Sequence, residues 1–159
     1  MGFLTNKTAI ITGAGRAVLS DGRCGSIGYG IATAYAKEGA NLVITGRNVQ
    51  KLTDAKEELE RLYGIRVLPV QADVHAGADN AAVVEQVVKQ AVDTFGDIHV
   101  LINNAQASAS GVTLADHTTE QFDLAMYSGL YATFHYMKAC YPYPVSYTHL
   151  RAHETEADL

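Results

Sequence analysis

Three observations predict a doubly wound α/β fold, in which helices cover both faces of a parallel sheet. Short apolar runs alternate along the chain with amphipathic stretches of about 12 residues, as strands alternate with helical crossovers. The strand runs are apolar almost throughout, which is typical of strands that are buried on both faces. A glycine-rich segment follows the first of these runs and precedes the first helix.

The strands and helices are placed from their apolar spacing and from the signals at their ends. Apolar, β-branched runs predict four strands, at residues 7–12, 41–45, 66–71 and 98–103. Helical spacing predicts four helices, at residues 27–38, 49–63, about 83–95 and from Thr118 or Thr119 to about Cys140. Asn48 is expected to cap the second helix, and Gly39 and Gly64 to end the first two. Pro69 favours an edge position for the third strand, because proline cannot donate a hydrogen bond to a neighbouring strand.

The composition excludes several classes of protein. With 159 residues, 48% of them hydrophobic and 18% charged, the chain is expected to fold as a globular protein rather than to stay disordered. Its net charge of -5 argues against a nucleic-acid partner, and no apolar run reaches the roughly 18 residues that a membrane-spanning helix needs. Cys24 and Cys140 lack the spacing of a disulfide framework or a zinc site. We therefore expect a cytoplasmic protein with no membrane partner and no bound metal.

The segment between the first strand and the first helix has the residues of a phosphate-binding loop. Thr12-Gly13-Ala14-Gly15 follows the strand, and Gly25-Ser26-Ile27-Gly28 opens the helix. Glycines let the backbone turn sharply and approach a pyrophosphate, and the helix N-terminus offers unpaired N–H groups to the anion. Because strand, loop and helix follow one another in this order, we interpret the segment as a dinucleotide-binding loop.

Three motifs along the chain resemble the short-chain dehydrogenase/reductase family. They are the glycine loop just described, then Ala72-Asp73-Val74 after the third strand, and Asn103-Asn104-Ala105 after the fourth. The resemblance extends from Lys7 to about Tyr143 and implies a Rossmann-type fold. It also implies that the glycine loop holds the dinucleotide, that the aspartate holds the adenine, and that the Asn-Asn-Ala segment steadies the sheet beside the cofactor. The cofactor-binding residues implied in this way are Gly13, Ser26, Ile27, Gly28, Asp73, Asn103 and Ala105.

The chain departs from the family pattern at four places, one of which is Ser26, where the first glycine of the Gly-x-Gly pair is common. Twelve residues, 14–25, stand in the glycine loop where the family usually has three. Either this insertion lengthens the path to the phosphates or it bulges into solvent, and Arg16 and Arg23 within it are candidates for contact with a phosphate. Gln106 stands where the family usually has a glycine, and Gly129 falls where its long helix has an asparagine.

The end of the second strand indicates which nicotinamide dinucleotide binds. It reads Thr45-Gly46-Arg47-Asn48, without the carboxylate that accepts hydrogen bonds from the ribose of NAD. A carboxylate would repel a 2′-phosphate, whereas an arginine pairs with one through two hydrogen bonds. We therefore predict that the cofactor is NADP(H), with Arg47 as the ligand of its 2′-phosphate. The alternative is that Arg47 is a solvated loop residue.

No catalytic residue is assigned. The resemblance implies hydride transfer assisted by a tyrosine, a lysine four residues later and a serine about thirteen residues before the tyrosine, but the chain contains no Tyr-x-x-x-Lys. The nearest imitation, Tyr147 with Arg151, has Phe134 at the position of the serine. We therefore expect the 159-residue chain to lack turnover, and its full-length parent to transfer hydride between NADP(H) and a small-molecule secondary alcohol or ketone.

The last residues differ in character from the rest of the chain. From Val145 to Thr155 they show neither strand alternation nor a helical apolar face, and they match the translation of a transposase-type sequencing-library adapter in one frame. We expect residues 144–159 to be a non-native tail. Residues 1–143 would then be the N-terminal dinucleotide-binding part of one domain, truncated after the fourth strand and its following helix. The full-length parent is expected to be a homo-oligomer.

Three segments narrow the expected substrate. Residues 103–111, 127–134 and 141–143 resemble a smaller group within the family, the bacterial NADP-dependent 12α-hydroxysteroid dehydrogenases. That resemblance implies a 12α-hydroxy bile acid as substrate. Two alternatives stay open: an enoyl reductase, because residues 26–32 resemble the loop of that branch, and a non-catalytic dinucleotide-binding protein. A downstream Tyr-x-x-x-Lys, with a serine thirteen residues before the tyrosine, would favour the alcohol dehydrogenase.

Overall fold

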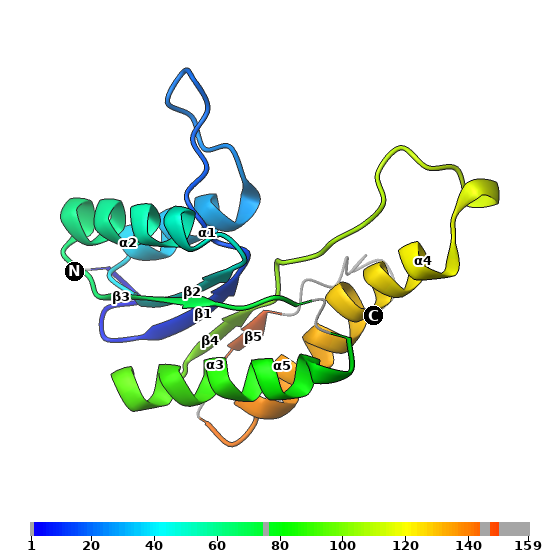
Figure 1. The fold of residues 1–159 in the computed structure, drawn as a ribbon. Helices are drawn as coiled ribbons and strands as arrows, with labels where there is room; N and C mark the ends of the chain where they lie inside the picture. Colours follow the sequence, from blue (N-terminus) through cyan, green and yellow to red (C-terminus); the bar gives the residue numbers. More distant parts are fainter. Residues whose placement is uncertain (1, 75–76, 144–146, 150–159) are drawn as a thin grey trace, which may run out of the picture.

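The computed structural model describes residues 2–74, 77–143 and 147–149, and it shows a five-stranded sheet between layers of helices (Figure 1). The strands are β1 (Thr8–Thr12), β2 (Asn41–Gly46), β3 (Val67–Gln71), β4 (Val100–Ile102) and β5 (Tyr147–His149). The helices are α1 (Ile27–Lys37), α2 (Val49–Tyr63), α3 (Asn80–Phe95), α4 (Thr119–Met126) and α5 (Ala132–Cys140). The strand order is β3-β2-β1-β4-β5, and every pair is parallel.

β1 lies in the middle of the sheet because its residues pair on both sides. Ile10 is opposite Val43 of β2 and Leu101 of β4. Within the described sheet β3 is an edge strand, so Pro69 has the position that the sequence predicts for it. The four predicted strands are all present, with bounds that differ from the prediction by at most two residues.

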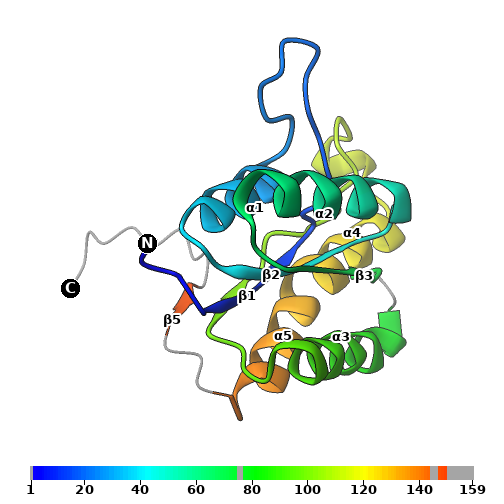
Figure 2. The ribbon, with the colours of Figure 1, turned by 90° about the vertical axis from the view of Figure 1, so that its left-hand side faces the viewer.

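Two cores form because successive residues of a strand face opposite layers. Ile11 and Ile44 are buried in the core that includes residues of α1 and α2, whereas Ile10 and Val43 are buried in the core that includes residues of α3 and α5. Figure 2 shows α1 and α2 on one side of the sheet and α3 and α5 on the other. The doubly wound arrangement that the sequence predicts is therefore confirmed.

Single residues define several helix ends. Asn48 Oδ1 accepts a hydrogen bond from the Lys51 N–H at 2.9 Å and so begins α2, and Gly64 ends that helix with a φ of 66°. Thr118 and Gln121 form a capping box, in which each side chain accepts from the other residue's backbone N–H. This box begins α4 at Thr119, where the sequence predicts the start of the long helix.

The long helix predicted as far as Cys140 is present but interrupted. A π-helical turn, Tyr127–Tyr131, separates α4 from α5. Such turns are rare and are often found at functional sites. The apolar spacing of the sequence does not reveal the turn, because it is too short to change the periodicity. In the described ranges, no helix is both long enough and apolar enough to cross a membrane.

The sheet extends one strand further than the sequence predicts. The backbone of β5 lies parallel to β4, with Val100 opposite Tyr147 and Ile102 opposite His149. The edge of β4 offers unpaired N–H and C=O groups, and tyrosine and threonine are residue types that favour strands, which explains the added pairing. The sequence does not predict this added strand, which lies within the segment expected to be a non-native tail. Of the predicted non-native tail, residues 144–159, the structure describes only 147–149, and residues 144–146 and 150–159 lie outside the described ranges.

Candidate functional site

Two cavities lie at the carboxyl edge of the sheet, which is where doubly wound folds bind ligands. The first has a volume of about 220 Å³ and is named here the edge cavity. Its lining residues are Gly13, Thr45, Gly46, Arg47, Ala72, Val74, Asn104, Ala105 and Gln106. The second has a volume of about 510 Å³ and is named the helix cavity, because the long helix forms one of its walls. Its lining residues are Asn103, Asn104, Ala105, Gln106, Ala125, Met126, Gly129, Leu130 and Thr133.

The glycine loop has no room for a side chain where the end of β1 meets α1. A Cβ on Gly28 would lie 2.2 Å from the Gly13 carbonyl oxygen and 2.6 Å from Asn104 Nδ2. Gly13 itself has a φ of +70°, which L side chains rarely adopt. The backbone of Gly13 therefore passes directly against the first turn of α1. This contact forms the kind of cradle that a bound pyrophosphate requires.

The N-terminus of α1 begins beside this cradle. Ser26 caps the helix, since its Oγ accepts a hydrogen bond from the Tyr29 N–H at 3.4 Å. Ile27 is the first helical residue and is 61% exposed. The first N–H groups of a helix and its dipole together provide positive potential for an anion. The structure thus brings the four predicted loop residues, Gly13, Ser26, Ile27 and Gly28, into one place.

Thr12 and Asn104 connect the ends of β1 and β4. The Thr12 hydroxyl accepts hydrogen bonds from the backbone N–H groups of Asn104 and Ala105, both at 2.9 Å. Asn104 Nδ2 in turn donates to the Thr12 carbonyl at 2.9 Å. Asn103 Nδ2 is buried with no hydrogen-bond partner among the described residues. Asn104, which the motif does not distinguish from its neighbour, therefore makes the side-chain contacts that fix the Asn-Asn-Ala segment.

Arg47 and Asp73 lie close to the ends of β2 and β3. Arg47 is exposed, lines the edge cavity and makes no ion pair with any residue in the described part of the chain. The described residues that line this cavity include no carboxylate. Asp73 is exposed and lies between Ala72 and Val74, which both line the cavity. Among the residues that line the edge cavity, Arg47 therefore supplies the positive charge that an anion requires.

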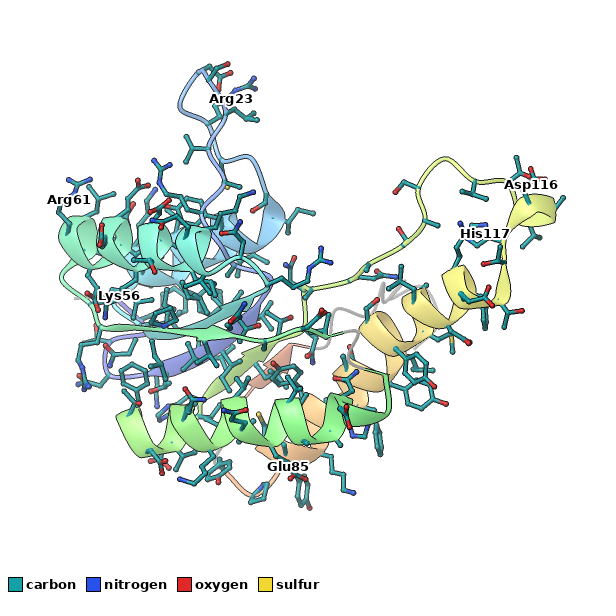
Figure 3. All side chains as sticks on the ribbon, viewed as in Figure 1. Arg23, Lys56, Arg61, Glu85, Asp116 and His117 are labelled. Carbon is teal, nitrogen blue, oxygen red and sulfur yellow. The ribbon has the colours of Figure 1, made fainter. Side chains whose placement is uncertain are left out.

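The insertion at residues 14–25 forms a short hairpin that stands away from the sheet (Figure 1). Val18 and Cys24 make an antiparallel bridge across it. Arg23 lies at its tip (Figure 3), where its guanidinium pairs with Asp21 at 2.7 Å. Of the two interpretations of the insertion, the geometry supports the one in which it bulges into solvent.

The base of the hairpin is fixed to α2 through a charged cluster. Arg16 Nε donates to Glu58 Oε2 at 2.7 Å, and the Arg16 backbone N–H donates to the Lys51 carbonyl at 2.8 Å. The Tyr29 hydroxyl donates to the other Glu58 oxygen. The hydrogen bond from Tyr29, together with that from Arg16, lowers the pKa of Glu58 below its ordinary value. Arg16, like Arg23, is therefore paired with a carboxylate of the protein itself.

A sequence model of the short chain dehydrogenase family matches residues 7–148. The chain belongs to this family. The matched residues include the glycine loop and every lining residue of both cavities. The resemblance to the short-chain dehydrogenase/reductase family, which rests on three sequence motifs, is therefore confirmed.

Individual members of the family extend this comparison. The 12alpha-hydroxysteroid dehydrogenase of Clostridium sp. (strain ATCC 29733) is 61% identical over 143 residues, which cover 90% of this chain and 52% of the relative. The structure of L-sorbose reductase from Gluconobacter frateurii, complexed with NADPH and L-sorbose, has a TM-score of 0.74 and 28% identity and covers 87% of this chain and 48% of that chain. An alcohol dehydrogenase from the archaeon Thermococcus sibiricus, complexed with 5-hydroxy-NADP, has a TM-score of 0.74 and 29% identity over 86% of this chain and 52% of that chain. The chain spans about half the length of these proteins.

Proposed function

We propose that the chain binds NADP(H) at the edge cavity, for hydride transfer between this cofactor and a secondary alcohol or ketone. The observation that carries the proposal is the contact of Gly28 with Gly13, where a Cβ would lie 2.2 Å from the carbonyl oxygen. So close an approach of backbone to a helix N-terminus serves a bound pyrophosphate, whereas an ordinary turn does not need it. Membership of an oxidoreductase family supports the same function.

Different residues at the edge of the sheet bind different parts of the cofactor. The pyrophosphate lies against the cradle and the first turn of α1. Arg47 pairs with the 2′-phosphate, and Asp73 forms a hydrogen bond with the adenine. Asn103 and Ala105 support the cofactor from the end of β4. The cradle residues are Gly13, Ser26, Ile27 and Gly28. NADP(H), when bound, supplies or accepts the hydride, and these protein groups bind and orient it.

The preference for NADP(H) depends on Arg47 and is tested by titrating the chain with NADPH and with NADH, followed by nicotinamide fluorescence. We expect NADPH to bind at least about tenfold more tightly, because a hydrogen bond to a charged group contributes about 1.5–3 kcal/mol. Arg47→Ser should weaken NADPH binding to the level of NADH and leave NADH unchanged. Arg23→Ser, at the tip of the hairpin, is the control and should change neither affinity. Equal affinities of the unaltered chain for the two dinucleotides would contradict the preference.

For the substrate we propose a hydroxysteroid, on the support of the 61% identity to a 12alpha-hydroxysteroid dehydrogenase. The 159 residues contain no Tyr-x-x-x-Lys, so the assay uses the protein encoded by the complete gene. We expect NADP⁺-dependent oxidation of a 12α-hydroxy bile acid and none of its 12-deoxy analogue. Reduction of an enoyl substrate without alcohol oxidation would favour the enoyl reductase alternative. No turnover of either substrate would favour a non-catalytic dinucleotide-binding protein. A cytoplasmic location and a homo-oligomeric full-length protein belong to the same proposal.

A further inference from the structure

Gln106 has a position that both cavities share. It directly follows the Asn-Asn-Ala segment at the end of β4, and it lines the edge cavity as well as the helix cavity. The residue is exposed, and its side chain forms no hydrogen bond within the described residues. A glutamine carboxamide carries two N–H donors and a carbonyl acceptor. These groups are therefore available to a ligand that extends from one cavity into the other.

The side chain of Gln106 lies over Gly129 in the π-helical turn. A Cβ on Gly129 would lie 3.5 Å from Gln106 Nε2, 3.7 Å from its Cδ and 3.8 Å from its Cγ. These are ordinary van der Waals distances, so the glutamine packs on the backbone of the turn. A side chain larger than a methyl group at position 129 would compete with the carboxamide for space in the helix cavity.

Hydrogen bonds of neighbouring residues fix the backbone on both sides of the contact between Gln106 and Gly129. The buried Ser128 hydroxyl accepts from the Ala107 N–H at 2.9 Å. The buried Asn80 side chain donates to the Tyr127 carbonyl at 3.0 Å, at the start of the same turn. The backbone beside Gln106 is thus connected to the backbone beside Gly129, and the turn is connected to α3. These contacts hold the backbone on which Gln106 stands close to the backbone of the turn.

We propose that Gln106 is a binding residue for the nicotinamide nucleotide half of the dinucleotide. This inference rests on the proposed function, which places the 2′-phosphate at Arg47 and the pyrophosphate at Gly13. The remainder of the ligand then continues past Gln106 into the helix cavity. The ribose hydroxyls of that half both donate and accept hydrogen bonds, so they match the donors and the acceptor of the carboxamide.

Two ligands separate the role of Gln106 from that of the rest of the site. NADPH contains both nucleotides, whereas adenosine 2′,5′-bisphosphate contains only the adenosine half with its 2′-phosphate. Gln106→Met keeps the length of the side chain and its packing on Gly129 but removes the carboxamide. We expect this variant to bind NADPH about fivefold more weakly, the effect of one neutral hydrogen bond, and to bind the bisphosphate as before. Gln86→Met, an exposed position on α3, is the matched control and should change neither affinity.

The outcomes distinguish this inference from the function on which it rests. If Gln106→Met binds NADPH as tightly as the unaltered chain, or loses affinity equally for both ligands, the inference is overturned while the proposed function stands. If the unaltered chain binds neither NADPH nor the bisphosphate, the proposed function fails and the inference fails with it. The melting temperature of each variant verifies that it is folded under the conditions of the titration.

Discussion

Two regions of the molecule differ in the contacts that fix their structure. One is the nucleotide side, which is β1 and β2 with the glycine loop, and the other is the arm, which is the segment from the end of β4 through α4 and the π-helical turn. All five residues of β1 are buried, as are the four central residues of β2. In α4 no described residue is buried, and Phe122, Leu130 and Phe134 along the long helix are 58%, 60% and 56% exposed. Figure 1 shows α4 and the loop before it extending away from the sheet. The close backbone contact between Gly13 and Gly28 fixes the first region. Hydrogen bonds of polar side chains, those of Ser128 and Asn80, fix the second.

This difference predicts two kinds of effect on dinucleotide binding. The first region determines whether the dinucleotide binds at all, and the second determines how tightly its nicotinamide half is held. The cradle depends on the contact between Gly13 and Gly28, which leaves no space for adjustment. The Gln106–Gly129 pair depends on the hydrogen bond that Ser128 accepts from the Ala107 N–H and on the one that Asn80 donates to the Tyr127 carbonyl. A change in the first region should therefore abolish binding, and a change in the second should alter it by degrees.

The largest effect is expected from Gly28→Ala. The added Cβ would meet the Gly13 oxygen and Asn104 Nδ2 at 2.2 and 2.6 Å, so the cradle has to move. We expect a loss of about 1–3 kcal/mol in the free energy of unfolding and no NADPH binding within the range of a fluorescence titration. Gly30→Ala is the control in the same helix, because a Cβ there meets Cys24 Sγ at 3.3 Å and has no other neighbour within 4 Å. Undiminished NADPH binding by Gly28→Ala would show that the cradle does not hold the cofactor.

An intermediate effect is expected from Ser128→Ala. This change leaves the part-buried Ala107 N–H without its side-chain partner, and the loss of one such hydrogen bond costs about 0.5–1.5 kcal/mol. Denaturant unfolding should show this loss of stability, and titration should show weaker binding of NADPH with unchanged binding of adenosine 2′,5′-bisphosphate. Ser110→Ala, at an exposed position of the same loop, serves as the control. A Ser128→Ala chain as stable as the unaltered one would mean that other contacts hold the arm.

The smallest effect is expected from the pH dependence that His99 contributes beside β4. The Thr8 N–H donates to His99 Nδ1 at 3.1 Å. Burial, and then the charge of Lys7, lower the pKa of His99 below its ordinary value of about 6.5. As the pH falls, the unfolded chain therefore takes up this proton before the folded chain does. The free energy of unfolding should decrease from about pH 6.5 toward the lower folded pKa and gain nothing more above pH 6.5.

His99→Asn tests this dependence, because asparagine keeps an acceptor near the position of Nδ1 and does not titrate. We expect the free energy of unfolding to decrease less in the variant than in the unaltered chain. The difference should be less than about 1 kcal/mol, which is the net contribution of one hydrogen bond. Denaturant unfolding at pH 7.5 and pH 5.5 measures the difference. The same decrease in both proteins would assign it to another group.

The regular parts of the fold are predictable from the sequence because they depend on neighbouring residues. Asn48 caps the helix that it precedes, Gly64 ends it in the left-handed region, and Thr118 with Gln121 begins α4. The π-helical turn and β5 are not predictable in this way. The turn involves contacts with α3 and with the loop after β4, and β5 depends on the open edge of a strand far away in the sequence.

The residues of the candidate site likewise differ in whether the sequence predicts them. The glycine loop and Arg47 are found from motifs, because their positions at the ends of strands place them at one edge of the sheet. Asn104 and Arg16 require the structure, because the partner of Asn104 is 92 residues away in the sequence and that of Arg16 is 42 residues away. The sequence leaves open whether Arg16 or Arg23 contacts a phosphate, and only the fold shows that Glu58 already holds Arg16.

The most direct test of NADP(H) binding at the edge cavity is a crystal structure of the chain with NADP⁺. We expect the pyrophosphate between Gly13 and the first turn of α1, and the 2′-phosphate within hydrogen-bonding distance of the Arg47 guanidinium. A pyrophosphate outside the cradle, or a 2′-phosphate that lies away from Arg47, would contradict this assignment.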